Sequence, residues 1–194
     1  MRIVAGRHKG RALKAPKGSV TRPTAARARE GLFNMLVHGG FGDEGGSVLT
    51  DAHVLEAFAG TGAFSFEALS RGAAAATLLD LDENAIEAAR ENARALDERD
   101  STTIIRMDAV RPRSPRNGAH DLVFLDPPYG TKLGILALHA LCTKGWIAQD
   151  ALVIIEVGAK EAFAPPEGFT AIKERSFGAA RFVLMRFENV KRQN

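Results

Sequence analysis

From residue 53 onward, short apolar runs alternate with amphipathic segments, and this alternation limits the possible folds more than any other feature of the sequence. Short runs rich in β-branched residues predict buried strands, and apolar residues spaced three or four apart predict helices. The order predicts an α/β fold in which a mostly parallel, seven-stranded sheet has helices on both faces. The expected strands cover residues 53–58, 76–81, 102–107, 122–126, 151–157, 169–175 and 181–187, and the expected helices cover 62–71, 83–96 and 133–142.

The first 29 residues form a basic arm. They carry nine basic and no acidic side chains, whereas the remaining 165 residues hold 17 basic and 23 acidic ones. Residues 2–14 place two short apolar pieces around a turn between Gly6 and Gly10, which predicts a β-hairpin with a basic tip. A basic surface on an acidic body suits a polyanionic partner, and a solvated tail is the plain alternative. The candidate phosphate contacts are Arg7, His8, Lys9, Arg11, Arg22 and Arg27.

A helix is expected over residues 25–37, with Thr24 as its N-cap. One face is apolar and would be buried, while Arg27, Arg29 and Asn34 would lie on the opposite face. Arginines in the first turn oppose the helix dipole, so they would suit a bound anion, and a chance placement explains them equally well. The chain is expected to divide into a basic hairpin and helix (1–38), a glycine-rich connection (39–51) and a core domain (52–190).

The composition favours a cytoplasmic protein. No apolar run approaches the ~20 residues of a bilayer span, and the first residues lack the apolar region of a signal peptide. Cys142 is the single cysteine, so an internal disulfide is excluded and a metal cluster is not expected. We therefore expect a reducing, cytoplasmic location without a membrane or a metal.

Acidic residues stand at or near the ends of four successive predicted strands, namely Glu56, Asp80, Asp108 and Asp126. Because the carboxyl ends of parallel strands meet at one edge of a sheet, we expect these side chains to converge there. Taken singly, each acid could be a turn or cap residue, and Asp82 is expected to be the N-cap of the helix after it. Together they predict a site that favours a cationic ligand.

A glycine loop, Ala-Gly-Thr-Gly at residues 59–62, leads directly into a predicted helix and allows a ligand to approach the backbone. Ser65 occupies the third glycine position of the dinucleotide fingerprint, which points away from NAD. S-adenosylmethionine fits better, because its sulfonium and ammonium groups are cations. Asp80 would accept from its ribose hydroxyls and Asp108 from its adenine amino group. The candidate cofactor-binding residues are Glu56, Ala59, Gly60, Thr61, Gly62, Asp80, Leu81, Asp108, Ala109 and Asp126.

Asp126, Pro127, Pro128 and Tyr129 follow the apolar run 122–125 and are the candidate catalytic residues. Proline cannot donate to a ladder and holds the residue before it extended, so the strand is expected to stop here. The stop presents a carboxylate and an aromatic ring at the edge where ligands bind. On its own, the tetrapeptide is also compatible with a plain structural turn.

The sequence resembles the class I, amino-methylating S-adenosylmethionine methyltransferases. Residues 56–62 (EAFAGTG), Asp80 and residues 126–129 (DPPY) resemble their motifs I, II and IV. The arm, through residues 2–11 and 22–34, narrows the resemblance to the RsmD family of small-subunit ribosomal RNA guanine-N2 methyltransferases. Glu56 stands where that family usually has aspartate and Asp80 where glutamate is common, and both replacements keep the carboxylate.

The resemblance implies a Rossmann-like fold, S-adenosylmethionine as cofactor and the exocyclic N2 of a guanine in 16S ribosomal RNA as target. The implied partner is that RNA, free or within a small-subunit assembly intermediate, with the basic arm as its contact. Tyr129 would stack on the extruded base, while Asp126 and the Pro127 carbonyl would accept the two amine N–H groups. With its pKa near the ordinary value of about 3.9, Asp126 would be a weak base, so its expected role is to orient the amine and stabilise charge in preference to removing a proton.

Two alternatives stay open. An adenine-N6 methyltransferase acting on DNA or RNA carries the same tetrapeptide, although the DNA enzymes usually have a separate target-recognition region that this chain has no length to spare for. A catalytically silent RNA-binding or ribosome-assembly factor could share the fold, and the intact glycine loop and tetrapeptide argue against it. A hydride-transferring enzyme is disfavoured by Ser65 and Glu56.

Overall fold

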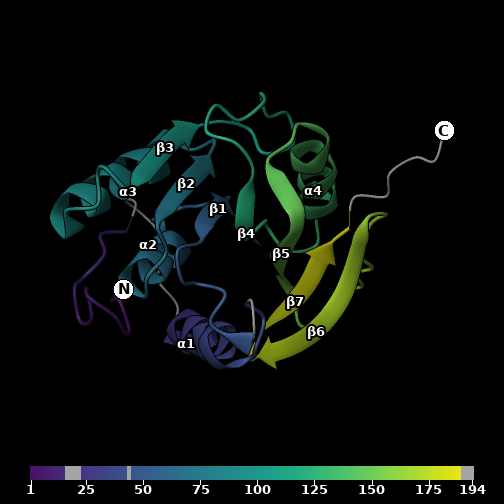
Figure 1. The fold of residues 1–194 in the computed structure, drawn as a ribbon, viewed down its shortest axis with the longest axis horizontal. Helices are drawn as coiled ribbons and strands as arrows, with labels where there is room; N and C mark the ends of the chain where they lie inside the picture. The colour runs from purple at the N-terminus through teal and green to yellow at the C-terminus, as the bar shows by residue number, and fades with distance from the viewer. Residues whose placement is uncertain (16–22, 43–44, 189–194) are drawn as a thin grey trace.

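The computed structural model describes residues 1–15, 23–42 and 45–188, with side chains of the first helix from residue 26 onward. One sheet forms the centre of the molecule (Figure 1). Its strands are β1 (His53–Ala57), β2 (Ala75–Asp80), β3 (Thr102–Arg106), β4 (His120–Leu125), β5 (Ile147–Gly158), β6 (Phe169–Phe177) and β7 (Ala180–Phe187). They lie in the order β3-β2-β1-β4-β5-β7-β6. β1 to β5 pair in parallel and β7 pairs antiparallel with β5 and β6, so the expected mostly parallel, seven-stranded sheet is confirmed.

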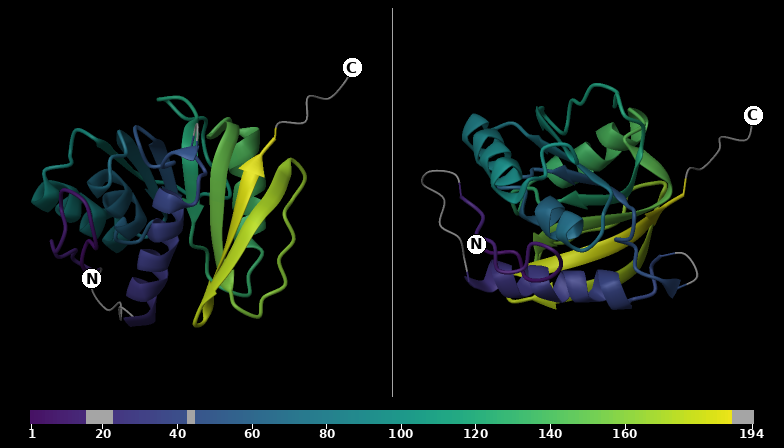
Figure 2. Two further views of the ribbon diagram at one scale, coloured as in Figure 1. Left: turned by 60° about the horizontal axis from the view of Figure 1, so that its bottom comes forward. Right: turned by 60° about the vertical axis from the view of Figure 1, so that its left-hand side comes forward.

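Helices cover both faces of the sheet, as expected (Figure 2). They are α1 (Pro23–His38), α2 (Ala63–Ser70), α3 (Glu83–Leu96) and α4 (Leu133–Thr143). α1, α2 and α3 share one core, which includes Phe33, Phe66 and Leu184. α4 packs on the other face, where Leu138 and Leu141 belong to a second core. None of the described helices combines the length and apolarity that a membrane crossing needs.

Every strand and helix expected from the sequence is present, and β5 has the one start that differs by more than two residues. β5 begins at Ile147, four residues before the expected position. Gln149 and Asp150 are exposed, and Asp150 has a φ of 61°, so this part of the sequence has the polarity and the left-handed residue of a turn. The strand nevertheless continues through this part, because Ile147 pairs with His120 and Leu152 with Leu122 of β4, and the register shifts between the two pairs.

The first 13 residues form the expected β-hairpin. Its two sides meet at an antiparallel bridge between Arg2 and Ala12, and the N–H of Ile3 donates to the carbonyl of Arg11 at 3.0 Å. The side chains of Ile3 and Leu13 are buried in the core that α1, α2 and α3 share. The division of the chain at residues 38 and 51 stays a prediction.

Main-chain groups attach the hairpin to α2. The N–H groups of Val4 and Ala5 donate to the buried carboxylate of Glu67 at 2.8 and 3.1 Å. Gly6 has a φ of +82°, and a side chain there would lie 1.8 Å from the carbonyl oxygen of Ser70, so glycine is required for this close approach. The hairpin is therefore a fixed part of the α2 face.

The connection from β3 to β4, residues 107–119, contains no helix, so α4 is the one described helix on its face of the sheet. Pro112 and Pro115 lack the backbone N–H that a helix interior needs, and Gly118 has a φ of 85°. The connection instead packs through Ala109, with Val110 beside it, against the core under α4.

Candidate active site

The glycine loop and Asp80 meet at the carboxyl edge of the sheet. The N–H of Gly60 donates to Oδ2 of Asp80 at 2.7 Å, which joins the ends of β1 and β2. Gly62 has a φ of +75°, and a Cβ there would lie 2.4 Å from a side chain of β2, so the entry into α2 requires glycine. Asp82 caps α3 by accepting from the N–H of Asn84 at 2.8 Å, as expected.

The other expected adenosine contacts follow β2 and β3. Leu81 is 60% exposed directly after Asp80. Asp108 accepts from the N–H of Val110 at 3.0 Å, so it also shapes the turn after β3, and Ala109 is buried. The edge thus offers an exposed apolar side chain from one strand end and a carboxylate from the next.

Glu56 lies one residue before the end of β1 and is buried. Its carboxylate accepts from the N–H groups of Phe64 and Ser65, in the first turn of α2, at 3.3 and 2.9 Å. Burial raises the pKa of Glu56 to about 7, and the hydrogen bonds from Ser65 and Phe64 and the charge of Arg29 oppose this rise. Glu56 therefore braces the glycine loop against the helix that follows it.

A cavity of about 190 Å³ opens at this edge, on the face that α1 and α2 cover. Asp80 and Tyr129 are not part of its lining, but each is hydrogen-bonded to a residue that is: Asp80 to Gly60 and Tyr129 to Glu156. The predicted residues that line the cavity are Glu56, Ala59, Gly60, Thr61 and Asp126, and Arg29, Phe58, Phe124, Glu156 and Phe182 are among its other neighbours.

The tetrapeptide after β4 is fixed at several points. The N–H of Asp126 donates to a carbonyl of β1 at 3.3 Å, and the hydroxyl of Thr131 donates to the carbonyl of Pro128 at 2.7 Å. Tyr129 is 42% exposed, and its hydroxyl donates to the carboxylate of Glu156. The loop therefore presents a carboxylate and an accessible ring at the edge where the cavity opens.

A family model described as "Conserved hypothetical protein 95" matches residues 1–186. The chain belongs to this family. Two proteins named "Ribosomal RNA small subunit methyltransferase D", from Haemophilus influenzae and Escherichia coli, are 32% identical over 187 residues and 31% identical over 189 residues. These alignments cover 95% and 97% of this chain and 92% and 90% of the two relatives. The resemblance to the RsmD family is thereby confirmed.

Solved structures share the fold. That of yhhF from Escherichia coli has a TM-score of 0.79 at 32% identity and covers 97% of this chain and 98% of its own. Magnesium protoporphyrin IX methyltransferase from Synechocystis PCC 6803, solved with bound S-adenosylmethionine, has a TM-score of 0.64 at 17% identity over 88% of this chain and 87% of its own, a likeness of fold alone. The Rossmann-like class I methyltransferase fold expected from the sequence is confirmed.

In this RsmD-family chain, Asp126 and Glu156 lie side by side, each one residue beyond the last aligned pair of β4 and β5. Asp126 is exposed as a residue, and it also lines the cavity together with Glu56 and Glu156. Burial, followed by the charges of Glu156 and Glu56, raises the pKa of Asp126 to about 8, so the expectation of an ordinary pKa is wrong. Burial also raises the pKa of Glu156, against the hydrogen bond from Tyr129.

Arg29 is buried, which corrects the expectation that it lies on the outer face of its helix. It is 8% exposed, and its guanidinium donates to the carbonyl of Arg2 at 2.8 Å and contacts the sulfur of Met1. Burial lowers the pKa of Arg29, while the charges of Glu67 and Glu56 raise it. The hairpin covers a second side of α1, so periodicity within the helix cannot reveal this burial.

Three of the candidate RNA contacts also attach the RsmD-type arm to the core. Arg7 and His8 both contact the buried carboxylate of Glu98, just after α3. The guanidinium of Arg11 donates to the carbonyl of Ala95. Their side chains are therefore partly engaged within the protein.

The remaining candidates differ in exposure. Lys9 at the hairpin tip and Arg27 on α1 are exposed, as is Asn34. Arg22 and the side chain of Thr24 lie outside the part of the chain that the structure describes. RNA contact by these residues stays a prediction.

Glu156 is the site residue that the sequence reasoning missed. It is the one acid in the apolar run 151–157, and an acid within a buried strand is rare unless it has a partner or a function. That signal, together with the position of β5 beside β4, would have identified it. Arg29 carries no comparable signal.

Proposed function

We propose that the chain transfers the methyl group of S-adenosylmethionine to the exocyclic N2 of a guanine in 16S ribosomal RNA. Family membership and the relatives named "Ribosomal RNA small subunit methyltransferase D" support the coarser statement, an S-adenosylmethionine-dependent rRNA methyltransferase. One observation carries the finer statement: Asp126 and Glu156 stand side by side at one cavity, with Tyr129 attached to Glu156.

The residues at the sheet edge fit the cofactor chemically. The carboxyl groups of Glu56, Asp126 and Glu156 gather around the cavity. The pKa of each is raised because its ionised form is unfavourable there, so a bound cation would stabilise that form and a pyrophosphate would not. Asp80 would hold the ribose hydroxyls, with Leu81 and Asp108 at the adenine. When bound, S-adenosylmethionine supplies an electrophilic methyl group on a sulfonium.

Two adjacent acceptors match guanine better than adenine. Guanine presents its N1–H and its N2 amino group side by side, so Asp126 can accept from the amine while Glu156 accepts from N1–H. Adenine presents a ring-nitrogen acceptor beside its amine, and that lone pair would face the carboxylate of Glu156. Glu156 keeps one oxygen for this contact while the other accepts from Tyr129.

Tyr129 and Asp126 take the remaining roles. A base inside a helix must leave its stack at a cost of a few kcal/mol, and stacking on the exposed ring of Tyr129 offsets about 1–3 kcal/mol of it. The Pro127 carbonyl and Asp126 orient the amine, and orientation supplies much of the acceleration. With a pKa of about 8, Asp126 is also able to accept the proton that the amine loses.

Nucleoside analysis tests the proposal. The purified chain is incubated with isotope-labelled S-adenosylmethionine and either protein-free 16S ribosomal RNA or small-subunit particles, and the digested RNA is examined by mass spectrometry. N2-methylguanosine is expected, and N6-methyladenosine would overturn the assignment. Asp126→Asn should lose methyl transfer while leaving cofactor binding largely intact. Absence of product from both substrates, with no cofactor binding by calorimetry, would favour the catalytically silent factor.

The same experiment addresses the state of the RNA. We propose 16S ribosomal RNA, free or within a partly assembled small subunit, as the substrate, because a hairpin and helix with exposed Lys9 and Arg27 can contact RNA beyond the target base. The rates of methylation of particles and of protein-free RNA at equal concentration would show which of the two forms is preferred.

A further inference from the structure

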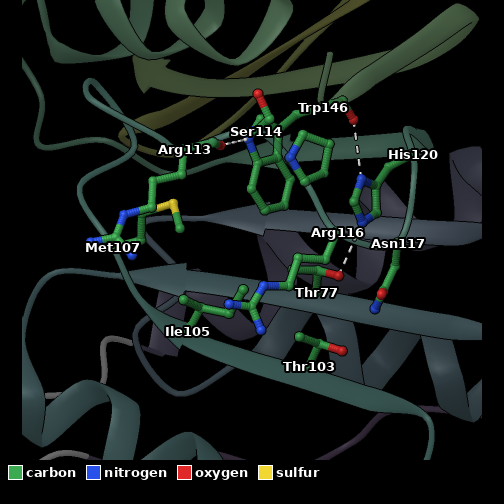
Figure 3. Close-up of a pocket in the computed structure, with 11 residues that line it drawn as sticks. Thr77, Thr103, Ile105, Met107, Arg113, Ser114, Arg116, Asn117, His120 and Trp146 are labelled. Carbon is green, nitrogen blue, oxygen red and sulfur yellow. Dashed lines mark hydrogen bonds between the residues drawn. The ribbon is translucent and has the colours of Figure 1, made fainter. Parts of the chain in front are cut away.

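A second and larger cavity, of about 500 Å³ (Figure 3), lies on the opposite face of the sheet from the candidate active site. Thr77 of β2 with Thr103 and Ile105 of β3 form its floor, and residues 113–117 of the β3–β4 connection lie across it. Its volume falls in the range of small-ligand and cofactor sites. None of the residues assigned above to cofactor or catalysis lines it.

The cavity exists because no helix fills this part of the sheet face. α4 covers β4 and β5, and the β3–β4 connection crosses β2 and β3 as a proline-interrupted loop. Two internal hydrogen bonds fix its wall: the indole N–H of Trp146 donates to the carbonyl of Arg113 at 2.6 Å, and His120 contacts the hydroxyl of Thr77 at 3.0 Å. The rings of His120 and Trp146 stack with centroids 5.6 Å apart. The cavity is therefore a slot whose wall consists of packed, hydrogen-bonded residues.

The rim of the cavity is cationic. Arg113 and Arg116, which line the cavity, are exposed, as is Arg111 two residues before Arg113, and none of the ion pairs among the described residues involves these three. Some exposed arginines elsewhere on the core lie beside an acid, as Arg90 and Arg94 on α3 lie beside Glu87. Others, such as Arg99 and Arg175, also have no ion pair among the described residues. Three unneutralised arginines on one short loop of an otherwise acidic body create a local positive field suited to phosphates.

We infer that this cavity binds a nucleotide of the RNA substrate other than the one that is methylated. Its base would enter the apolar slot beside Ile105 and Met107, and its phosphates would lie on Arg113 and Arg116. Recognition of unpaired bases in pockets with flanking cations is the usual way in which proteins read single-stranded RNA. The hydroxyl of Thr103 and the amide of Asn117 supply hydrogen-bonding groups at the slot.

The position of the connection supports this occupant. The connection begins with Asp108 and Ala109, at the cofactor edge, and then runs over the face that carries α4. The basic hairpin lies on the other face, against α2 and α3. RNA whose target base enters the candidate active site would thus be held on both faces of the sheet, by the hairpin on one and by the second cavity on the other. The inference rests on the proposed function, because it takes RNA as the substrate.

Charge reversal on the rim tests it. The double variant Arg113→Glu, Arg116→Glu should weaken binding of 16S ribosomal RNA by about tenfold or more and reduce the salt slope of binding by about 2, one for each phosphate contact. Calorimetric binding of S-adenosylmethionine should not change. The matched control is Arg90→Glu, Arg94→Glu, which makes the same charge change on α3 and should bind RNA nearly as wild type does.

A second variant tests the slot itself. Thr103→Phe fills the cavity and leaves the arginines, so it should weaken RNA binding while keeping the wild-type salt slope, with thermal melting as the check of folding. RNA binding by both variants at the wild-type level, with wild type active, would overturn the inference. So would loss of activity on small-subunit particles without loss of RNA binding, because the surface would then contact a protein. A wild type that methylates no RNA would instead refute the proposed function.

Discussion

The hydroxyl of Tyr129 donates a hydrogen bond to the carboxylate of Glu156, which ties the loop after β4 to the next strand of the sheet. The same carboxylate stands beside Asp126. The aromatic ring and the two acidic groups therefore form one unit. A substitution of Glu156 would remove the hydrogen bond from Tyr129 or change the charge beside Asp126.

Removing this hydrogen bond should have a smaller effect than removing the ring. Tyr129→Phe is expected to lower kcat/KM for RNA by about three- to tenfold, since a hydrogen bond contributes about 1 kcal/mol net. Tyr129→Ala also loses stacking, worth about 1–3 kcal/mol, and should lower kcat/KM by a further factor of about ten or more. Steady-state kinetics with calorimetry of cofactor binding as control would measure both. Equal losses in the two variants would contradict a stacking role.

The raised pKa of Asp126 makes methyl transfer depend on pH. An ionised Asp126 accepts from the amine, so kcat/KM should rise with pH and level off above the pKa of about 8. Glu156→Gln removes one charge that raises this pKa, so the rise should move to lower pH. A pH series of single-turnover rates checks both expectations. A rate that falls between about pH 6 and 8 would show that the protonated form is the active one.

Glu56 links stability to pH with a definite sign. Its pKa is about 7 in the folded chain and near 4.5 ordinarily, so the folded state binds the proton more tightly. The contribution of Glu56 to the free energy of unfolding is fully present below pH 4.5. It decreases as the pH rises from 4.5 through 7, by about 3 kcal/mol in total. In urea unfolding, the free energy of unfolding of Glu56→Gln should therefore fall less than that of wild type between pH 4.5 and 7.

The exposed Glu87→Gln is the control for this comparison and should follow the wild-type curve. If the free energies of unfolding of Glu56→Gln and wild type changed with pH in parallel, the predicted linkage would be wrong.

The basic hairpin separates RNA contact from structural attachment. Lys9→Glu should weaken RNA binding and reduce its salt slope by about 1 without changing Tm, because Lys9 is exposed at the tip. Arg7→Glu should lower both RNA affinity and Tm, because it sets a like charge against Glu98. Lys144→Glu, an exposed site at the end of α4, is the matched control. Wild-type affinity in Lys9→Glu would show that the tip does not contact phosphates.

Most of the fold could be predicted from the sequence because its signals are local. Alternating apolar runs located all of the strands, and Asp82 marked the start of α3 by the chemistry of capping. The early start of β5 could not be predicted, since Gln149 and Asp150 resemble a turn and lie between the first two pairs at its start, where the register with β4 shifts. The helix-free connection at 107–119 was visible in Pro112 and Pro115, but the cavity beneath it depends on packing between distant elements.

The site was predictable where one strand end supplied the chemistry. Asp126 follows β4 and Asp80 ends β2, so their placement at one edge follows from parallel pairing. The burial of Arg29 and the high pKa of Asp126 depend on which groups surround them in space, and no spacing in the sequence encodes that.

The attachment of the hairpin to Glu67 and Ser70 uses nitrogen atoms of the main chain, those of Val4, Ala5 and Arg7. Any amino acid except proline provides such a donor. Evolution can therefore replace the outward-facing side chains of this segment, and so adapt what it recognises, while Glu67, Gly6 and the buried Ile3 and Leu13 keep the segment in place.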